Sequence, residues 1–256
     1  MRKTLEKVQK VYFLNLLRQA RAKVLRDAEA AGAIIHVLER MGMFLAGEML
    51  CLAEYEGYIK GVAGCSLLAK RVPKAAKLHI PFFELYRSVR EARNTAMHEG
   101  AYARHLATHA VKLALVLENA LMNGLDLVRD LMVPNPVCAE MWQPLSFIRQ
   151  TMLENSFSHL PVRTSGDGLC TWKLVSDESL ARYLRAAGTA EGMKQRLVQP
   201  LAEAVQMDGI RFCEAKQCDQ EETVSSVIAE WNGLPILVVR KDSTDLMGIL
   251  TAFDLL

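Results

Sequence analysis

A change of hydrophobic period near residue 129 is the feature that most constrains the fold of this 256-residue chain. Before it, apolar residues recur at helical spacing, as in the stripe Leu5, Val8 and Tyr12. Beyond it, short β-rich runs alternate with short helical segments and turn residues. The sequence therefore predicts an α+β protein, with an all-α helical bundle over residues 1–128 and an α/β unit over residues 129–256.

The first half is expected to hold four or five helices joined by short connections. The stripe from Ile34 to Leu52 predicts a long second helix that breaks at about Gly57–Gly64. After a basic connection from Lys70 to Lys77, the helical pattern returns over residues 82–99 and 101–122. Short connections favour antiparallel neighbours, so we expect a bundle.

The second half repeats itself. Leu160-Pro161-Val162 superposes on Leu234-Pro235-Ile236, and in the same superposition Ser176 falls one residue out of step with Thr251. Each unit then runs helix, aromatic residue, Leu-Pro, strand, turn, strand, polar residue and helix. Two such units stacked together would bury the apolar surface that neither could bury alone.

The second repeat carries the most specific motif of the chain. The strand Leu234–Val239 is followed by Gly248-Ile249-Leu250-Thr251-Ala252-Phe253-Asp254. This Gly-x-x-Thr-x-x-Asp pattern at a strand–helix junction resembles a CBS domain, and residues 129–256 resemble a CBS pair (a Bateman module) with repeats at about 130–190 and 200–256. The resemblance implies that an adenosine nucleotide (ATP, ADP or AMP) binds in the cleft between the repeats as a regulatory ligand.

Thr251 and Asp254 are the expected ligand-binding residues. Thr251 stands where a strand ends and a helix begins, so its hydroxyl and the free amides there can face a phosphate. Asp254, one turn later, can accept hydrogen bonds from both ribose hydroxyls. The first repeat has Lys173 in place of the glycine and Ser179 in place of the aspartate, so one site per chain is expected. The alternative is an ordinary helix cap, in which Asp254 completes a capping box with Thr251.

One stretch of the helical half carries residue types suited to phosphodiester chemistry. Arg93-Asn94 followed by His98 is similar to the Arg-polar-x-x-x-His motif of HEPN domains, all-helical bundles that often act as metal-independent RNases. The resemblance assigns His98 as acid/base toward a ribose 2′-OH, Arg93 as counter-ion of the phosphorane, and Asn94 as an orienting group. It implies an RNA substrate, 2′,3′-cyclic phosphate products and no metal.

The spacing of this motif raises a geometric question. Arg93 and His98 are five residues apart, so on one straight helix they diverge by about 140°. The length of Arg93, a bend at Gly100, or a second copy of the helix could bring them together. The last option, together with the face-to-face association common among CBS pairs, predicts a homodimer.

Three other interpretations of this region stay open. Arg93 and His98 could form a polar surface or interhelical pair in a catalytically lapsed bundle. Arg104 to His109 satisfies the same motif pattern. His105 and His109, four residues apart, could grip a metal ion, but no matching cysteine or carboxylate pair stands out, and no metal is expected.

Composition narrows the classes of function. Contents of 51% hydrophobic and 23% charged residues are typical of a globular protein. A net charge of +2 gives no global field for nucleic acid, so RNA contact would need a local patch, for which Lys70–Lys77 is the candidate and a solvated loop the alternative. No apolar run reaches the roughly 18 residues of a membrane span. The six cysteines lack a CxxC pair, and the charged N-terminus does not predict a signal peptide, so a cytoplasmic protein with reduced thiols and no membrane contact is expected.

These patterns give one functional hypothesis and two rivals. The hypothesis is a metal-independent endoribonuclease of HEPN type whose activity is regulated by an adenosyl nucleotide, with stress or phage-defence signalling suggested by family association. The first rival is a non-catalytic protein that senses nucleotide and dimerises. The second is a HEPN-type partner of a separate nucleotidyltransferase.

Overall fold

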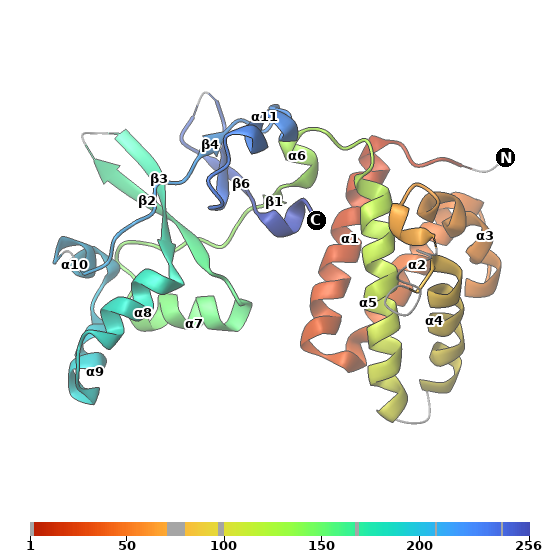
Figure 1. Ribbon diagram of the computed structural model, residues 1–256, viewed down its shortest axis with the longest axis horizontal. Helices are drawn as coiled ribbons and strands as arrows, with labels where there is room; N and C mark the ends of the chain where they lie inside the picture. Colours follow the sequence, from red (N-terminus) through yellow and green to blue (C-terminus); the bar gives the residue numbers. More distant parts are fainter. Residues whose placement is uncertain (1–2, 71–79, 97–99, 167–168, 208, 242) are drawn as a thin grey trace. The chain divides into compact units, whose positions relative to one another are not determined.

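The computed structural model describes residues 3–70, 80–96, 100–166, 169–207, 209–241 and 243–256. Its contacts divide the chain into two units, Met1–Leu125 and Asp126–Leu256. The first unit is built of helices, whereas the second mixes helices and strands (Figure 1). The α+β class predicted from the sequence is confirmed.

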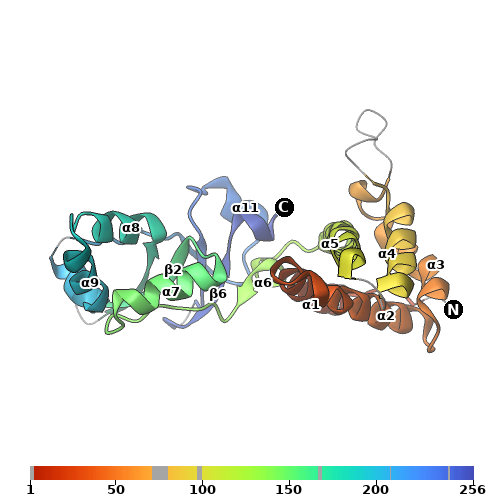
Figure 2. The ribbon, with the colours of Figure 1, turned by 90° about the horizontal axis from the view of Figure 1, so that it is seen from below.

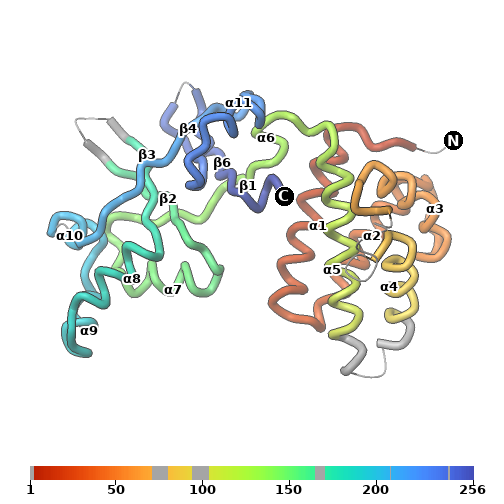
Figure 3. Tube along the Cα trace, viewed as in Figure 1, coloured from red at the N-terminus to blue at the C-terminus, as the bar shows by residue number. Residues whose placement is uncertain are grey.

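The elements of the first unit are long helices with short 3-10 turns between some of them: α1 (Lys7–Arg26), η1 (Ala28–Ala31), α2 (Gly32–Ala46), α3 (Leu52–Ala63), η2 (Leu67–Ala69), α4 (Phe82–Ala96) and α5 (Gly100–Met122). The long helix α5 packs against both α1 and α4, and α2 packs against α1 and α3. Figure 3 traces α1 and α5 running side by side.

The apolar stripes of these helices meet in one core. Its largest fully buried side chains come from all five helices and include Phe13, Leu17, Leu38, Met41, Tyr55, Ile59, Leu85, Tyr86, Leu113 and Leu117. Burying a side chain of this size stabilises the fold by about 1.5–3 kcal/mol relative to leaving it in water. The stripe Leu5, Val8 and Tyr12 predicted for the first helix is not part of this core, because Val8 and Tyr12 are exposed by 76% and 46%. Helix α1 buries its neighbouring face instead, through Phe13, Leu14 and Leu17.

The predicted second helix is shorter than its apolar stripe. It ends at Ala46, because Gly47 adopts a left-handed conformation with φ of 82° and closes the last turn. A separate helix, α3, starts at Leu52 and runs through Gly57 and Gly61. The predicted break was therefore placed too late, because the stripe continues across a turn that only the conformation of Gly47 reveals.

Tyr55 closes the connection between α2 and α3. Its hydroxyl accepts a hydrogen bond from the amide of Leu50 at 2.7 Å and donates to the carbonyl of Glu48 at 3.3 Å. Its ring lies so close to α2 that a Cβ at Gly42 would sit 2.3 Å from the ring. Glycine is needed there for close packing of the two helices.

The second unit alternates short helices and strands: α6 (Val128–Leu131), β1 (Val133–Pro134), α7 (Leu145–Asn155), β2 (His159–Gly166), β3 (Leu169–Ser176), α8 (Asp177–Arg185), α9 (Ala190–Val198), α10 (Leu201–Gln206), β4 (Gln217–Cys218), α11 (Val224–Ala229), β5 (Ile236–Val239), β6 (Leu246–Leu250) and the 3-10 turn η4 (Ala252–Asp254). The strands form one sheet of order β1-β6-β5-β4 and a β2–β3 hairpin. Helices α7 and α8 pack on that hairpin (Figures 1 and 2).

The two hairpins of this unit have the same register as far as Val238, after which the second is shifted by an irregularity between Val238 and Val239. In the first, Val162 of β2 pairs with Lys173 of β3; in the second, Val238 of β5 pairs with Gly248 of β6. Leu160 is thus equivalent to Ile236, and not to Leu234 as the Leu-Pro superposition predicted. The prediction was wrong by two residues because Leu-Pro lies inside the first strand but before the second.

Each hairpin also has a parallel neighbour at the same position. Ala139 bridges Val162, and Cys218 of β4 pairs with Val238. All four of these residues are buried. The internal repeat inferred from the sequence is therefore present in the backbone as well.

The remaining edge of each sheet is supplied by the segment that leads into the other repeat. Val133 of β1, which precedes the first hairpin, pairs with Ile249 of the second hairpin. Cys213, which precedes the second hairpin, bridges Leu174 of the first hairpin. The short helices follow the same rule, because α6 hydrogen-bonds to the start of α11 and α10 to the start of α7. The two repeats therefore interlock by exchanging edges.

None of the helices within the described residues combines the length and apolar character that a membrane crossing requires.

Candidate functional site

Thr251 and Asp254 lie together at the junction that follows β6. The Asp254 carboxylate oxygen Oδ2 accepts hydrogen bonds from the Thr251 amide at 2.8 Å and from the Thr251 hydroxyl at 2.7 Å. Asp254 is buried, with only 7% of its surface exposed. The capping box that sequence reasoning kept as an alternative is thus present, and both bonds to the carboxylate are of the strong, charge-assisted kind.

These hydrogen bonds limit how a ligand could bind at the junction. A ribose hydroxyl that donates to Asp254 Oδ2 would compete with the Thr251 hydroxyl for the same oxygen. If the Thr251 hydroxyl were released, it could turn to a phosphate oxygen, because a hydroxyl rotates freely about its C–O bond. The cap and the expected ligand site are therefore two uses of the same pair of side chains.

The glycine of the motif has a packing role. A Cβ at Gly248 would lie 2.6 Å from the sulfur of Met132 and 3.0 Å from the carbonyl oxygen of Val133, which belong to the exchanged edge. The first repeat places Lys173 at the equivalent position, and its ammonium nitrogen lies 2.6 Å from a carboxylate oxygen of Glu214. The residue at this position therefore suits the edge segment beside it: glycine packs closely in the second repeat, and lysine forms an ion pair in the first.

The serines of the first repeat are engaged in structure. The Ser176 hydroxyl accepts a hydrogen bond from the amide of Ser179 at 3.1 Å and so caps α8. The Ser179 hydroxyl accepts from the amide of Arg211 at 3.1 Å, on the segment that leads into the second repeat. This junction has no carboxylate at the position equivalent to Asp254, so the two repeats differ in chemistry at matching places.

Arg93 lies near the end of α4 and faces α2. Its terminal nitrogen Nη2 lies 2.9 Å from Oε1 of Glu39, and 44% of its side chain is exposed. Asn94 also lies on α4, whereas His98 falls outside the described residues. Arg93 therefore takes part in an interhelical ion pair with Glu39.

The second match to the motif lies on α5. The imidazole rings of His105 and His109 are 4.2 Å apart between centroids, and Nδ1 of His109 lies 2.9 Å from the carbonyl oxygen of His105. Because a carbonyl only accepts, Nδ1 of His109 is the donor in this contact. Across the part of the chain that the structure describes, no group of three or more metal-ligating side chains occurs.

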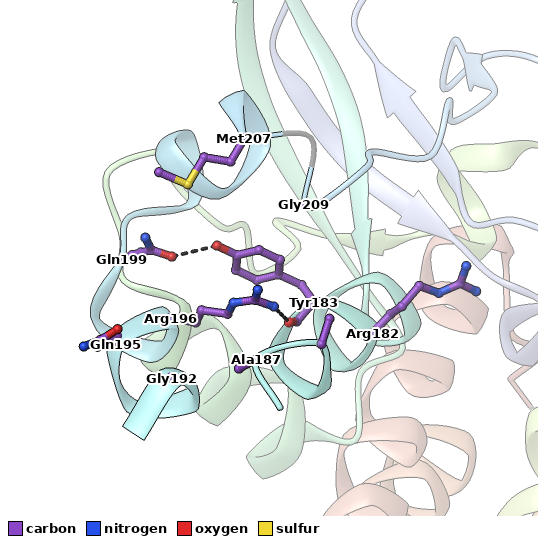
Figure 4. Close-up of a pocket in the computed structure, with 10 residues that line it drawn as sticks. Arg182, Tyr183, Ala187, Gly192, Gln195, Arg196, Gln199, Met207 and Gly209 are labelled. Carbon is purple, nitrogen blue, oxygen red and sulfur yellow. Dashed lines mark hydrogen bonds between the residues drawn. The ribbon is translucent and has the colours of Figure 1, made fainter. Parts of the chain in front are cut away.

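A pocket of about 590 Å³ opens between α8, α9 and α10, and Tyr183 lies at its centre (Figure 4). The guanidinium of Arg196 stacks 4.5 Å from the centroid of the Tyr183 ring and donates a hydrogen bond to the Tyr183 carbonyl. The Tyr183 hydroxyl donates to Gln199 at 2.7 Å, and Arg182 points away from the ring. These bonds tie α9 to the first repeat, so the main polar groups of the pocket serve the fold. Sequence reasoning missed this cluster.

Two further pockets, of about 310 and 790 Å³, share Trp172 and Thr244 in their linings. The Trp172 indole donates a hydrogen bond to the Thr244 carbonyl at 2.7 Å and so joins the first hairpin to the second repeat. Thr251 and Asp254 line neither pocket.

The described cysteines are free: Cys51, Cys65, Cys138, Cys213 and Cys218. Burial raises the pKa of the Cys138 thiol and of the Cys218 thiol to about 11. At neutral pH both are protonated, which makes them poor nucleophiles. These two thiols act as small apolar side chains.

Comparisons with known proteins bear on the second unit only. No protein-family model and no curated protein matches the sequence. The solved structures similar to the C-terminal half are CBS-domain proteins. They include ATU1752 from Agrobacterium tumefaciens (16% identity, TM-score 0.37, 50% of this chain and 90% of that chain). Two others are CBSX2 in complex with AMP (17%, 0.35, 50% and 91%) and CbpB in complex with c-di-AMP (12%, 0.38, 52% and 84%).

Proposed function

We propose that the second unit is a CBS pair that binds one adenosine nucleotide (ATP, ADP or AMP) per chain at Thr251 and Asp254, and that the protein senses this nucleotide as a regulator. The observation that carries the proposal is the pair of interlocked repeats with equal register, of which the second ends in Gly-x-x-Thr-x-x-Asp. A buried carboxylate at the end of a strand is costly to keep unless it has partners. Asp254 keeps such a carboxylate where the motif places the ribose.

The geometry of the pair supports a site that is formed before the ligand arrives. The Thr251 amide donates to Asp254 Oδ2 at 2.8 Å, and this bond holds the carboxylate in one orientation even when a ligand releases the Thr251 hydroxyl. A preorganised acceptor loses less conformational entropy when it binds two ribose hydroxyls. In the first repeat, the matching hydroxyl of Ser179 already accepts a backbone hydrogen bond, which supports one site per chain.

Calorimetry with ATP, ADP and AMP tests this proposal. The Asp254→Asn variant keeps an oxygen that can accept from Thr251 but removes the charge, and the matched control is Ser179→Ala in the first repeat. We expect one nucleotide per chain and a loss of about 1.5–3 kcal/mol in Asp254→Asn, since hydrogen bonds to a charged group contribute that much. Ser179→Ala should bind as the unaltered protein does. Equal affinity in the unaltered protein and Asp254→Asn would remove Asp254 from the site.

A second candidate function concerns the first unit: cleavage of RNA without a metal, gated by the nucleotide, in a two-fold homodimer. The observation that favours it is the position of Arg93 near the end of α4. Its side chain is nearly half exposed, and Glu39 of α2 holds it in place. A guanidinium that is fixed but still accessible suits the stabilisation of a phosphorane. If the bundle is not catalytic, the protein is a nucleotide sensor whose helical unit dimerises or docks a partner.

Incubation of the purified protein with RNA, with and without ATP or AMP, tests the second candidate. We expect new ends that carry a 2′,3′-cyclic phosphate and a 5′-hydroxyl, and no inhibition by EDTA. With His98 as the acid or base that the motif implies, His98→Ala slows cleavage by about 10²–10⁴-fold. Absence of cleavage under every nucleotide condition would leave only the non-catalytic sensor.

A further inference from the structure

Glu39 on α2 holds two groups that phosphodiester chemistry can use. Its Oε1 lies 2.9 Å from Nη2 of Arg93, on α4, and its Oε2 lies 3.5 Å from Nδ1 of His36, one turn earlier on α2. His36 and Glu39 share a face of α2 because they are three residues apart. One carboxylate therefore brings an imidazole from one helix to a guanidinium from another.

Both groups keep reactive atoms directed away from Glu39. A guanidinium has five N–H donors, and the contact with Glu39 involves the Nη2 end of Arg93. The His36 side chain is 80% exposed and contacts Glu39 through Nδ1, so Nε2 is the nitrogen available to a substrate. An accessible imidazole nitrogen and an accessible guanidinium, linked by a carboxylate, are the groups that a metal-independent transesterification needs.

We infer that His36, Glu39 and Arg93 form the cleavage site of the helical unit within a single chain, an inference that rests on the ribonuclease proposal. Nε2 of His36 takes the proton from the ribose 2′-OH, and O2′ forms a bond to phosphorus. The P–O5′ bond then breaks and a water molecule protonates O5′. The hydroxide that remains takes the proton from His36, which returns the imidazole to its neutral form. The products are a 2′,3′-cyclic phosphate and a 5′-hydroxyl, with no change of oxidation state.

Arg93 and Glu39 have distinct parts in this step. Arg93 neutralises the charge that grows on the phosphorane oxygens. Glu39 is a positioning residue, since it touches His36 and Arg93 and not the substrate. This site gives the role of base to His36, whereas the motif gives it to His98, so His98→Ala should keep most of its kcat where His36→Ala loses it.

An ordinary surface ion pair would explain the same distances, and the chain offers a control for it. Arg90, one turn before Arg93 on α4, pairs with Glu56 of α3 at 3.5 Å. Glu39 and Glu56 are also similarly exposed in these pairs, at 31% and 33% of their side chains. Glu56→Gln therefore breaks an interhelical pair of α4 without touching the inferred site.

The experiment measures kcat and KM for cleavage of an RNA oligonucleotide by the full-length protein and by Glu39→Gln, Glu39→Asp, His36→Ala and Glu56→Gln. We expect kcat to fall by ~10²–10⁴-fold in His36→Ala, which loses the base. In Glu39→Gln we expect a fall of ~10²-fold with KM nearly unchanged, because the groups are misplaced but still present. Glu39→Asp should recover part of the loss. Glu56→Gln should cleave as the unaltered protein does, and thermal unfolding should be similar in all variants, since exposed ion pairs add little stability.

The outcomes separate this inference from the function on which it rests. Cleavage by the unaltered protein with full kcat retained in Glu39→Gln or in His36→Ala would overturn the site and leave the ribonuclease standing. Equal losses in Glu39→Gln and Glu56→Gln would show that any broken α4 pair has the effect, which also overturns it. Absence of cleavage by the unaltered protein would overturn both.

Discussion

The two repeats of the second unit have the same backbone arrangement but differ in the side chains in and after the second strand of each hairpin. The first repeat has Lys173 and Ser179 where the second has Gly248 and Asp254. In the first, Lys173 forms an ion pair with the edge segment, and Ser179 accepts a hydrogen bond from it. In the second, Gly248 leaves room for Met132, and a buried carboxylate stands at the junction.

This difference teaches that equal register does not make equal sites. The strands place the four side chains at matching points, but the exchanged edge that covers each hairpin decides what those side chains contact. A polar side chain that bonds to its own edge is a structural group. In the second repeat, the polar groups of the junction, Thr251 and Asp254, bond to each other.

The largest expected effect tests whether the repeats form one cooperative unit. Leu160→Ala and Ile236→Ala remove equivalent buried side chains, exposed by 1% and 0%. Each should lower the free energy of unfolding by about 2–5 kcal/mol, as large-to-small changes in a core do. Because the sheets share edges, both variants should shift the same transition in urea, followed by far-ultraviolet circular dichroism. Two transitions that respond to one variant each would mean that the repeats unfold separately.

A smaller effect on stability compares how Gly248 and Lys173 pack against the edge segments of their hairpins. Gly248→Ala forces a methyl group against Met132 and the carbonyl of Val133, so we expect a loss of about 1–3 kcal/mol, the usual cost of overpacking. Lys173→Ala removes an exposed ion pair in the first repeat and should cost less than about 1 kcal/mol. Thermal unfolding of both variants would check the order. If Lys173→Ala lowered the stability more than Gly248→Ala, the ion pair would contribute more to stability than the close packing at Gly248.

The smallest effect is a pH dependence that belongs to the second repeat. Cys218 stands where the first repeat has Ala139, and burial raises its thiol pKa from 9.0 to about 11. A raised pKa means that the folded state favours the neutral thiol. Its contribution to stability is therefore complete below the unfolded pKa and is lost as the pH rises from about 9 toward 11.

Cys218→Ala copies the first repeat and should flatten this loss of stability above pH 9, measured by urea unfolding at several pH values. Cys138 has a similarly raised pKa and stays in place, so part of the loss should persist. An unchanged pH profile in Cys218→Ala would show that this thiol does not titrate differently in the folded state.

Local pattern was enough to predict the fold class and the internal repeat, and it offered the capping box of Thr251 and Asp254 as the alternative to a ligand site. Periods of apolar residues and a motif at a strand end are properties of neighbouring residues, so they can be read without the fold. The exchange of edges could not be predicted, because Val133 and Ile249 are more than a hundred residues apart and no local pattern near either residue indicates that they pair.

The same reason explains what was missed in the helical unit. Arg93 was selected for its motif, but its partner Glu39 lies on another helix, and no local pattern connects them. The end of α2 depended on a left-handed glycine within an unbroken apolar stripe. Sequence spacing predicts what a residue can do, whereas its partner is set by packing between distant segments.

The exchange of edges has a consequence for how this protein can be divided. A fragment cut between the repeats would carry β1 without the hairpin that it completes, and its own hairpin would lose the segment that contains Cys213. Each half would then present unpaired backbone amides and carbonyls along a sheet edge, the kind of surface on which chains aggregate. A cleavage in the connection that left both pieces together would keep every one of these pairings. Proteolysis of the linker should thus leave a nicked unit that stays folded. Truncation at the same residue should instead give an insoluble fragment.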